Sequence, residues 1–468
     1  MCNRPRTASI HTLDDDSLLH IFYLFQPFLL EDRYTVAEWR YSGYWWYTLA
    51  HVDRRWRSII LGSASYLGLS LLCTYGTPVA DMLAHSPPIP IDIGYFRTGR
   101  ILTTKDQEGI ILALKQRDRV RRVRFGNAVM HKLFVDIDEE YPILEHLYIT
   151  RADKDNSTIL RFPETLQAPH LRYLSLGGFA FPIGSRLLTT AVGLVTLHLV
   201  MVHPSTYFHP STLIQWISLM PHLETLKIYF KSSIPNRDVE RQLTHAPNIA
   251  PITLPNLHFI SFRGVSSYLE ELVHRITTPR LGKLRINFFH QLSFSVPHLL
   301  EFIDAAENLR FGSAVLIFSD KFVEAGALHP GDAGMFPLLI RVICRHLDWQ
   351  VSSATQFFKS SQMFSSVERL VFRYEVHSES SEEHNEVDRT EWRKLLRPFS
   401  NVKTLRIKKE LVKNLSRCLE LEDGELPLEL LPELHEIRTF GSGDTGGSFT
   451  SFINARRNAG RPVTLIRE

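Results

Sequence analysis

The stretch that decides the fold is PHLETLKI, residues 221–228. Its apolar residues Leu223, Leu226 and Ile228 are separated first by two residues and then by one. The final alternation has the period of two that a β-strand shows when one face is buried, and the proline before it is typical of a turn. The same pattern returns along the chain with its first apolar residue at Val120, Leu144, Leu171, Leu194, Leu257, Leu281, Val367, Val402 and Leu434.

The spacing of these copies predicts repeated units of one strand and one helix. From Leu144 to Leu281, successive copies begin 27, 23, 29, 34 and 24 residues apart. Between them lie apolar residues with helical spacing, such as Leu213, Trp216 and Ile217. One such unit cannot cover its own apolar face, whereas stacked units can. We therefore expect an α/β fold, an irregular leucine-rich-repeat solenoid of strand–helix units with a parallel sheet on its concave face.

The longest interval between copies, from Leu281 to Val367, is 86 residues, the length of about three units. We expect two further strands in it, near Val315–Phe318 and Trp349–Val351, and the repeat number between 282 and 366 stays open. The alternative is an ordinary α/β domain whose strands happen to look alike. Regular leucine-rich repeats carry an asparagine after the strand, which these copies lack, so the curvature should be uneven.

The first sixty residues have a different, helical pattern. Thr12 followed by Asp15 predicts a capped helix start, because such side chains satisfy the free amide groups at a helix N-terminus. Apolar residues with helical spacing follow at Leu18, Ile21, Phe22 and Phe25. A second helical stripe consists of Trp45, Leu49, Val52, Trp56 and Ile59. Two such short helices cannot bury their apolar faces alone, so they must pack on each other and on a further surface. They serve either as a cap for the repeats or as a docking surface for another protein.

The segments LDDDSLLHIFYLF and WWYTLAHVDRRWRSII together resemble an F-box. In that motif a leading leucine opens a helix of type LxxxxLLxIF, and a later helix ends in a V-x-x-x-W pattern, here Val52 and Trp56. Asp14 stands where the motif usually has proline, and the stretch Gln26–Tyr44 between the helices is longer than usual. The layout of the whole chain is similar to large fungal F-box families with divergent leucine-rich repeats.

F-boxes bind the small adaptor subunit of cullin–RING ubiquitin ligases, so the resemblance implies this adaptor and the cullin scaffold as partners. It also implies which side chains form or support the adaptor contact. They are Leu13, Leu18, Leu19, Ile21, Phe22, Leu49, Val52 and Trp56.

Prolines mark the segment between the helical motif and the repeats, at Pro78, Pro87, Pro88 and Pro90. We expect an F-box-like helical motif at residues 8–62, a connecting segment at 63–100 and a leucine-rich-repeat-like solenoid at 101–468. Within the connecting segment, Leu69–Cys73 has the composition of a strand.

The variable strand positions of the repeats should face outward, since they alternate with the buried positions. These positions hold eight Lys or Arg and one acid, in a chain with 53 basic and 50 acidic residues. Arginine and aromatic side chains are enriched on recognition surfaces. Basic residues that only deter pairing between sheet edges are the alternative. We predict that an acidic or phosphorylated target protein contacts Arg122, Arg124, Tyr148, Tyr173, Lys227, Phe259, Lys283, Arg285 and Arg406.

Composition and charge argue against several classes of protein. A net charge of +3 does not by itself suggest nucleic acid or a membrane surface. No uncharged run reaches the roughly 18 residues that span a bilayer, and the acids Asp14–Asp16 before the first apolar stretch argue against a signal peptide. The four cysteines are far apart and form no CxxC pair, which is typical of reduced thiols. We expect a cytoplasmic or nuclear location, or both.

Two stretches have the composition of chemical sites, and the sequence argues against both. GSGDTGG at residues 441–447 contains a G-x-G-x-x-G string, but there is no room after it for a dinucleotide fold. We expect a flexible loop between the last strand and the last helix. His377 and His384 lie in an acidic run of the kind that usually forms a solvated loop. We therefore expect no catalytic residue, no metal and no cofactor, and hence no enzyme.

The preferred hypothesis is a substrate receptor, whose helical motif binds a ubiquitin ligase and whose repeats hold an unknown target. A protein-interaction scaffold without ligase engagement is the first alternative. A nucleotide-dependent enzyme that uses Gly441, Gly443 and Gly446 is the second, and an equilibrium nucleotide-binding assay would test it. An RNA binder is the third, and steep salt dependence would reveal it.

Overall fold

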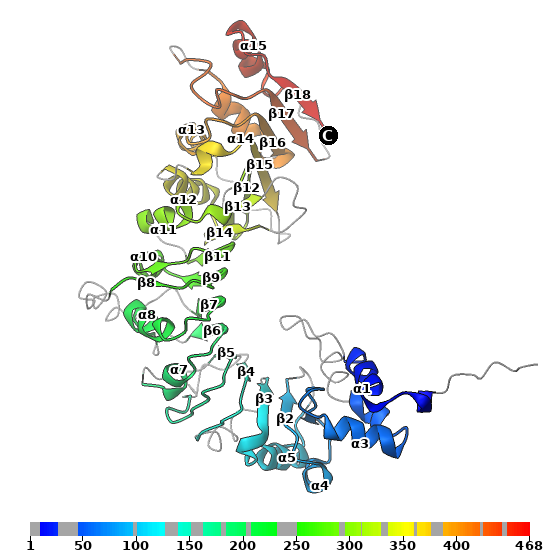
Figure 1. The fold of residues 1–468 in the computed structure, drawn as a ribbon. Coiled ribbons are helices and arrows are strands. Elements are labelled where there is room, and N and C mark those ends of the chain that lie inside the picture. Colours follow the sequence, from blue (N-terminus) through cyan, green and yellow to red (C-terminus); the bar gives the residue numbers. More distant parts are fainter. Residues whose placement is uncertain are drawn as a thin grey trace, which may run out of the picture. The chain divides into compact units, whose positions relative to one another are not determined.

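A computed structural model describes residues 10–26, 45–96, 101–126, 139–150, 162–178, 184–202, 207–231, 250–289, 295–309, 311–328, 336–359, 363–375, 387–421, 425–441 and 447–468. The chain divides into two compact units, Met1–Leu194 and Val195–Glu468. Both units are built from strands and helices that alternate along the chain (Figure 1).

In the first unit the strands form a parallel sheet in which sequence neighbours are also spatial neighbours. Two of the strands fall in the segment predicted as a connection, and the three-part division of the chain stays a prediction. The strands are β1 (Leu71–Thr74), β2 (Ile91–Tyr95), β3 (Val120–Phe125), β4 (His146–Thr150) and β5 (Tyr173–Gly177). The helices are α1 (Asp15–Leu24), α3 (Arg54–Gly62), α4 (Val79–His85), α5 (Thr104–Leu114) and α7 (Arg186–Thr190), with 3₁₀ turns η1 (Ile10–Thr12) and η2 (Arg117–Arg119).

In the second unit the sheet order is β6–β7–β9–β11–β14–β13–β12–β15–β16–β17–β18. All pairs are parallel except those of β13. The strands are β6 (Thr196–Val202), β7 (Thr225–Phe230), β9 (Phe259–Gly264), β11 (Lys283–Phe288), β12 (Ser313–Ser319), β13 (Phe322–Leu328), β14 (Leu338–Ile343), β15 (Arg369–Glu375), β16 (Thr404–Lys408), β17 (Glu436–Phe440) and β18 (Thr464–Arg467). A separate pair consists of β8 (Ile252–Thr253) and β10 (Ile276–Thr277).

The helices of the second unit lie along one side of its strands (Figure 1). Neighbouring helices pack on one another, including α10 on α11 and α12 on α13. They are α8 (Pro210–Ser218), α10 (Ser266–Val273), α11 (Pro297–Asp304), α12 (Leu347–Lys359), α13 (Arg389–Leu396), α14 (Lys409–Leu419) and α15 (Thr450–Asn458), with 3₁₀ turns η5 (Glu307–Leu309) and η6 (Met363–Ser366). We call the opposite side of the strands the open face.

The core of each unit contains the apolar residues of the repeated pattern. The first apolar residue of every copy is buried, and a strand begins at or shortly after each one. In β7, Leu226 and Ile228 are buried, while Lys227 and Tyr229 are half-buried on the open face. Full burial of a Leu or Ile side chain contributes about 1.5–3 kcal/mol, so the copies supply the driving force for stacking. The predicted α/β fold with repeated leucine-rich strand–helix units is confirmed.

One segment departs from the regular repeat. β12, β13 and β14 form an antiparallel meander in reversed order, so that β14 pairs with β11 and β12 pairs with β15. Val315–Phe318 lie in β12, as predicted, but Trp349–Val351 lie in α12 and the expected second strand was wrong. All seven residues of β12 are buried, so this strand lacks the alternation that marks the other copies.

The N-terminal helices also differ from the sequence pattern. Asp14, and not Thr12, caps α1, because its side chain accepts a hydrogen bond from the backbone N–H of Ser17 at 2.6 Å. The second helical stripe is broken: residues 45–50 are helical, and α3 begins only after Asp53. The Asp53 carboxylate accepts from the N–H of Trp56 at 2.9 Å, and aspartate is favoured at this position because it satisfies a free helix amide.

The end of the chain holds a strand that the sequence did not predict. β18 follows α15 and pairs in parallel with β17, whereas a helix was expected to come last. Within β18 only Leu465 is half-buried and its neighbours are exposed. The strand therefore lacks the buried apolar pair that identifies the other copies.

Candidate interaction surfaces

α1 and α3 pack against each other through large apolar side chains. Leu18, Phe22, Trp56 and Ile60 are all buried. The rings of Phe22 and Trp56 have centroids 4.9 Å apart. Three of the residues predicted for the adaptor contact, Leu18, Phe22 and Trp56, therefore lie inside the helical pair.

Polar contacts fix the start of α1 against α3. The Nε of Arg55 donates to the Asp15 carboxylate at 2.8 Å, and its Nη2 donates to the Leu13 carbonyl oxygen at 2.7 Å. Because one guanidinium group binds both a side chain and the backbone, it sets the angle at which the chain enters α1. The helical pair is thus held by a buried apolar contact and an exposed polar one.

The other predicted adaptor residues remain partly accessible. Val52 is 56% exposed, and Leu13, Leu19, Ile21 and Leu49 are half-buried. The structure therefore brings these side chains to the outside of the helical pair.

Sequence reasoning missed two apolar side chains at the end of α1 as surface residues. Leu24 is 70% exposed and Phe25 is 60% exposed, although Phe25 was predicted for the buried face. The reason is that α1 ends at Leu24, so Phe25 no longer follows the helical stripe. The periodicity of the apolar residues does not show where α1 ends, so it could not identify Phe25 as a surface residue.

In the sheet of the first unit, basic and aromatic side chains at the variable strand positions form two rows across the strands. Arg122, His146 and Tyr173 are register partners, as are Arg124 and Tyr148. The imidazole of His146 stacks on the ring of Tyr173, with centroids 5.5 Å apart. Burial, followed by the nearby arginines, lowers the pKa of His146 to about 3, so this residue is neutral at physiological pH.

On the open face of the second unit, two lysines flank one aromatic ring. The Nζ atoms of Lys227 and Lys283 each lie 5.4 Å from the centroid of Phe259. The guanidinium of Arg285 is exposed next to them, in one register row with Ser261 and Lys227. We call Lys227, Phe259, Lys283 and Arg285 the basic–aromatic cluster. The structure thus brings together four predicted target-binding residues from three adjacent strands.

The same register row turns apolar beyond Arg285. It continues through Leu339, Gly326, Val315 and Val371 before it reaches Arg406 on β16. Among the described residues, Val315, Ile317 and Val371 form a buried apolar cluster that Phe336 and Phe440 cover. The basic character of the face is therefore interrupted and does not form a continuous track.

Arg406, another predicted target residue, contacts a carboxylate of the same chain. Its Nη2 lies 2.5 Å from the Oε2 of Glu468. The two residues are 62 positions apart in sequence, and sequence reasoning did not identify Glu468. Only the pairing of β17 with β18 brings this carboxylate onto the open face.

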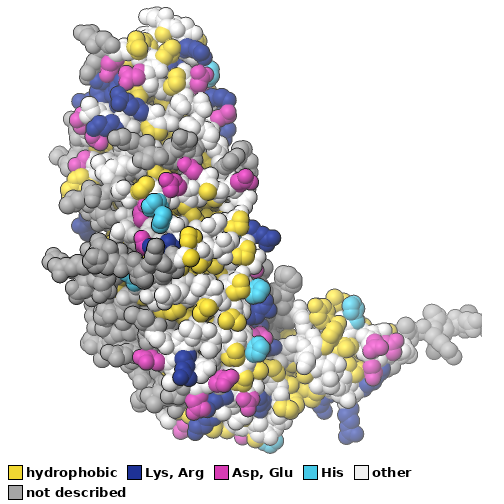
Figure 2. All heavy atoms as spheres, turned by 60° about the vertical axis from the view of Figure 1, so that its left-hand side comes forward, with side chains coloured by type: hydrophobic (Ala, Val, Ile, Leu, Met, Phe, Trp, Pro, Cys, Tyr) yellow, Lys and Arg dark blue, Asp and Glu magenta, His cyan; other side chains and the backbone are white. Residues whose placement is uncertain are grey.

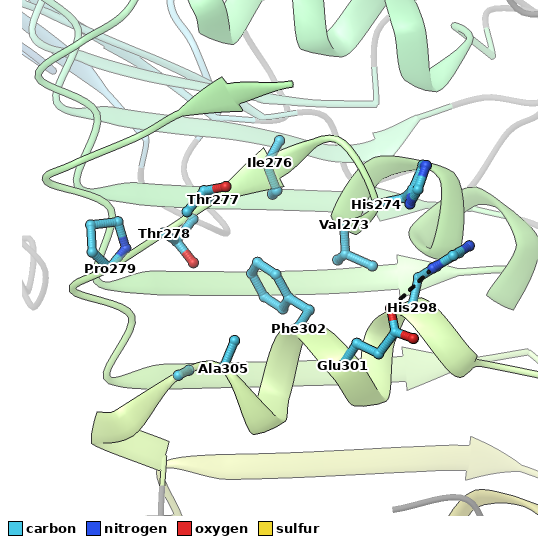
Figure 3. A pocket seen from close by; sticks show the side chains of 11 residues that line it. Val273, His274, Ile276, Thr277, Thr278, Pro279, His298, Glu301, Phe302 and Ala305 are labelled. Carbon is cyan, nitrogen blue, oxygen red and sulfur yellow. Dashed lines mark hydrogen bonds and ion pairs between the residues drawn. The ribbon is translucent and has the colours of Figure 1, made fainter. Parts of the chain in front are cut away.

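A groove on the helix-covered side lies between α10, α11 and β10, and Figure 3 shows its lining. Its volume is about 240 Å³. The imidazoles of His274 and His298 face each other at one end with centroids 4.2 Å apart, and Nδ1 of His298 is 3.5 Å from a Glu301 oxygen. The groove is smaller than the roughly 300–1,000 Å³ of typical small-molecule sites, and no predicted site residue lines it.

Of the stretches considered for enzymatic chemistry, His377, His384, Gly443 and Gly446 lie outside the described residues. Within the described ranges, no group of three or more His, Cys, Asp or Glu could hold a metal ion. Burial raises the thiol pKa of three cysteines to about 12. Because of this high pKa, the thiols stay protonated and unreactive at neutral pH. These cysteines are Cys73, Cys344 and Cys418.

The surface seen in Figure 2 mixes acidic and basic side chains along the second unit. This pattern contrasts with the excess of cations in the basic–aromatic cluster on the open face. Among the helices in the described ranges, none combines the length and apolar character needed to span a bilayer.

Comparison with known proteins identifies no family. No family model matches the chain, and no curated protein matches it either. Among solved structures, it is similar to the leucine-rich repeat-containing protein LegL7 from Legionella pneumophila, at 10% identity and a TM-score of 0.24. The similarity covers 85% of this chain and 99% of that one. At this level it establishes neither shared descent nor shared function.

Proposed function

We propose that this chain is a substrate receptor. Its N-terminal helical pair binds the small adaptor of cullin–RING ubiquitin ligases, and the open face of its repeats holds a target protein. The observation that carries the target-binding part is the basic–aromatic cluster, whose four side chains project from three hydrogen-bonded strands. Because the paired strands fix the backbone of these residues, the spacing between the four side chains is set before a partner binds.

An acidic protein segment matches the chemistry of this cluster. Arg285 can bind a carboxylate through two parallel hydrogen bonds, and the two lysines add positive charge. Phe259 adds apolar contact area between them. An RNA strand would favour a continuous basic track, whereas the row becomes apolar from Leu339 onward. The interruption therefore favours a protein partner over RNA.

The adaptor contact is assigned to accessible apolar side chains of the helical pair, among them Leu19 and Val52. Accessible apolar side chains commonly mark a protein interface when they form a patch. Leu18, Phe22 and Trp56 support the contact indirectly, because they hold α1 against α3.

The proposed mechanism is proximity. A receptor that binds the ligase at one end and the target at the other raises the effective concentration of the target near a catalytic module. The chain itself then needs no catalytic residue. Both contacts must be made at the same time, so either one alone gives no transfer.

The test is direct binding of the purified full chain to the purified adaptor, measured by calorimetry. We expect binding at micromolar concentration or tighter, and its loss in the double variant Leu19→Ala, Val52→Ala. Absence of binding by the wild-type chain at micromolar concentration would exclude the ligase role.

A scaffold without ligase engagement is the second candidate, and one observation favours it. The chain turns at His51 and Val52, so Val52 does not share a continuous helix with Trp56 as the F-box resemblance implies. If the adaptor does not bind while target capture through the open face persists, this candidate replaces the first.

A further inference from the structure

Arg406 on β16 and Arg438 on β17 lie opposite each other in the parallel register of the two strands. The side-chain carboxylate of Glu468 bridges them. Its Oε2 is 2.5 Å from Nη2 of Arg406, and its Oε1 is 3.0 Å from Nη1 of Arg438. Each carboxylate oxygen therefore has its own guanidinium donor, an arrangement that selects for the planar geometry of a carboxylate.

The two arginines belong to a site that extends over β15, β16 and β17. The Cζ of Arg406 lies 5.4 Å from the centroid of the Phe440 ring, and Val371 is its register partner on β15. The Nε of Arg406 is shielded from solvent and has no hydrogen-bond partner among the described residues. Glu468 thus leaves part of the donor capacity of this guanidinium unused.

Further charged side chains lie on the strands that carry the two arginines. Besides Glu468, the carboxylate of Glu436 contacts Arg438, with 2.5 Å between Oε1 and Nε. On the basic side stand both arginines and Lys408, whose Nζ donates to the Tyr374 carbonyl oxygen at 2.5 Å. Lys408 therefore adds positive charge to the same strand that carries Arg406.

The contact with Glu468 is also open to exchange. The side chains of Arg406, Arg438 and Glu468 are 38%, 39% and 31% exposed. Water and salt screen ion pairs at such exposures, so each contributes little to stability. A ligand that brings several carboxylates can therefore replace a single one.

We propose that Arg406 and Arg438 form a carboxylate clamp for an acidic segment of a partner protein, and that Glu468 occupies this clamp until the partner binds. The inference rests on the proposed function, since it specifies the chemistry of a target held by the open face. Glu468 shows the pose that one acidic side chain of the partner adopts. Phe440, which is half-buried beside the clamp, favours an apolar residue next to that acidic one.

The experiment uses the full chain and a fluorescein-labelled hexaglutamate peptide, with affinity measured by fluorescence anisotropy at about 0.1 M salt. Glu468→Gln removes the negative charge of the internal competitor, so we expect binding about two- to tenfold tighter than that of the wild type. Adding Arg406→Gln and Arg438→Gln to this variant removes the clamp, and we expect affinity to fall at least tenfold.

Glu433→Gln is the matched control. Glu433 lies near the same end of the chain, pairs with Arg461 at 3.6 Å and carries the same charge, but it does not touch the clamp. Equal gains for Glu433→Gln and Glu468→Gln would show a long-range charge effect and overturn the proposal. So would an unchanged affinity in Glu468→Gln, or no binding of the peptide to either chain. Thermal unfolding of each variant verifies that the repeats remain folded.

Failure of this inference can be told apart from failure of the proposed function. Adaptor binding depends on α1 and α3, and target capture is tested at Lys283 and Arg285, neither of which belongs to the clamp. A clamp that rejects hexaglutamate leaves both of those results unchanged. A chain that ignores the adaptor can still bind the peptide.

Discussion

The ring of Phe22 on α1 lies against the indole of Trp56 on α3, with the ring centroids 4.9 Å apart and the planes inclined by 58°. Both side chains are buried, so this contact joins the two helices and is not presented to a partner. Substitutions in the helical motif therefore fall into two groups. Some remove the packing between the helices, and others change only their outer surface.

Trp56→Ala belongs to the first group. Truncation of a buried tryptophan typically costs about 3–5 kcal/mol, more than a short helical pair can lose without opening. We expect hydrogen exchange by mass spectrometry to show lost protection in α1 and α3 and retained protection in β7 and β9. Leu18→Ala should act in the same direction. Unchanged protection in α1 would mean that Trp56 does not hold the helices together.

The double variant Leu19→Ala, Val52→Ala belongs to the second group. Leu19 is half-buried and Val52 is mostly exposed, so their truncation should leave protection of α1 and α3 almost unchanged. We expect adaptor affinity to fall at least tenfold in calorimetry. An unaltered affinity would place the adaptor contact elsewhere on the chain.

Charge reversal tests the open face. Lys283→Glu with Arg285→Glu replaces attraction by repulsion at the basic–aromatic cluster, so we expect quantitative pull-down of acidic target proteins to weaken at least tenfold. The matched control is Lys105→Glu with Arg457→Glu, which reverses the same number of charges at exposed helix positions. Equal losses in the two variants would indicate a nonspecific charge effect. Thermal stability should not change in either.

The repeats could be predicted because their buried residues are close in sequence. Leu223, Leu226 and Ile228 report the alternation of one strand within six residues, and the helix before it, α8, has its own period. The meander of β12, β13 and β14 could not be predicted in this way. β12 is buried on both faces, which erases the alternation, and the order of strands in a sheet is set by packing over long sequence distances.

The candidate sites show the same contrast between features encoded locally in the sequence and features set by distant parts of the chain. The outward positions of Lys227, Lys283 and Arg285 follow from alternation alone. The bridge from Glu468 to Arg406 depends on two strands that pair after a long excursion of the chain, and no local pattern encodes it. The sequence therefore predicts which residues face outward, but not which of them meet.

His146 provides a test in the pH dependence of stability. The folded-state pKa of His146 is about 3 and lies below the ordinary histidine pKa of 6.5, so between these values the unfolded chain binds a proton that the folded chain does not. Stability is therefore full above pH 6.5 and falls as the pH drops toward 3, by up to about 1.4 kcal/mol per pH unit.

We expect His146→Gln to reduce the drop in unfolding temperature between pH 6.5 and pH 4.5. His170→Gln, which replaces an exposed histidine of the same unit, is the control and should leave that drop as in the wild type. The same drop in all three chains would show that His146 is protonated in the folded state as readily as in the unfolded one.

Gly326→Ala tests the apolar cluster on the open face. A Cβ at this position would lie 2.6 Å from a carbon of the Phe336 ring, closer than packed atoms approach, so the ring must move off Val315 and its neighbours. Overpacking of this kind costs about 1–3 kcal/mol.

Phe336→Ala alone destabilises the protein because it removes buried apolar area. In the double variant, however, it also removes the ring with which the new Cβ would clash. In a denaturation cycle of the four chains, we therefore expect the double variant to be more stable than the sum of the two single effects implies, by about 0.5–3 kcal/mol. Additive effects would mean that Gly326 and Phe336 do not touch in solution, and that the cluster is covered by other side chains.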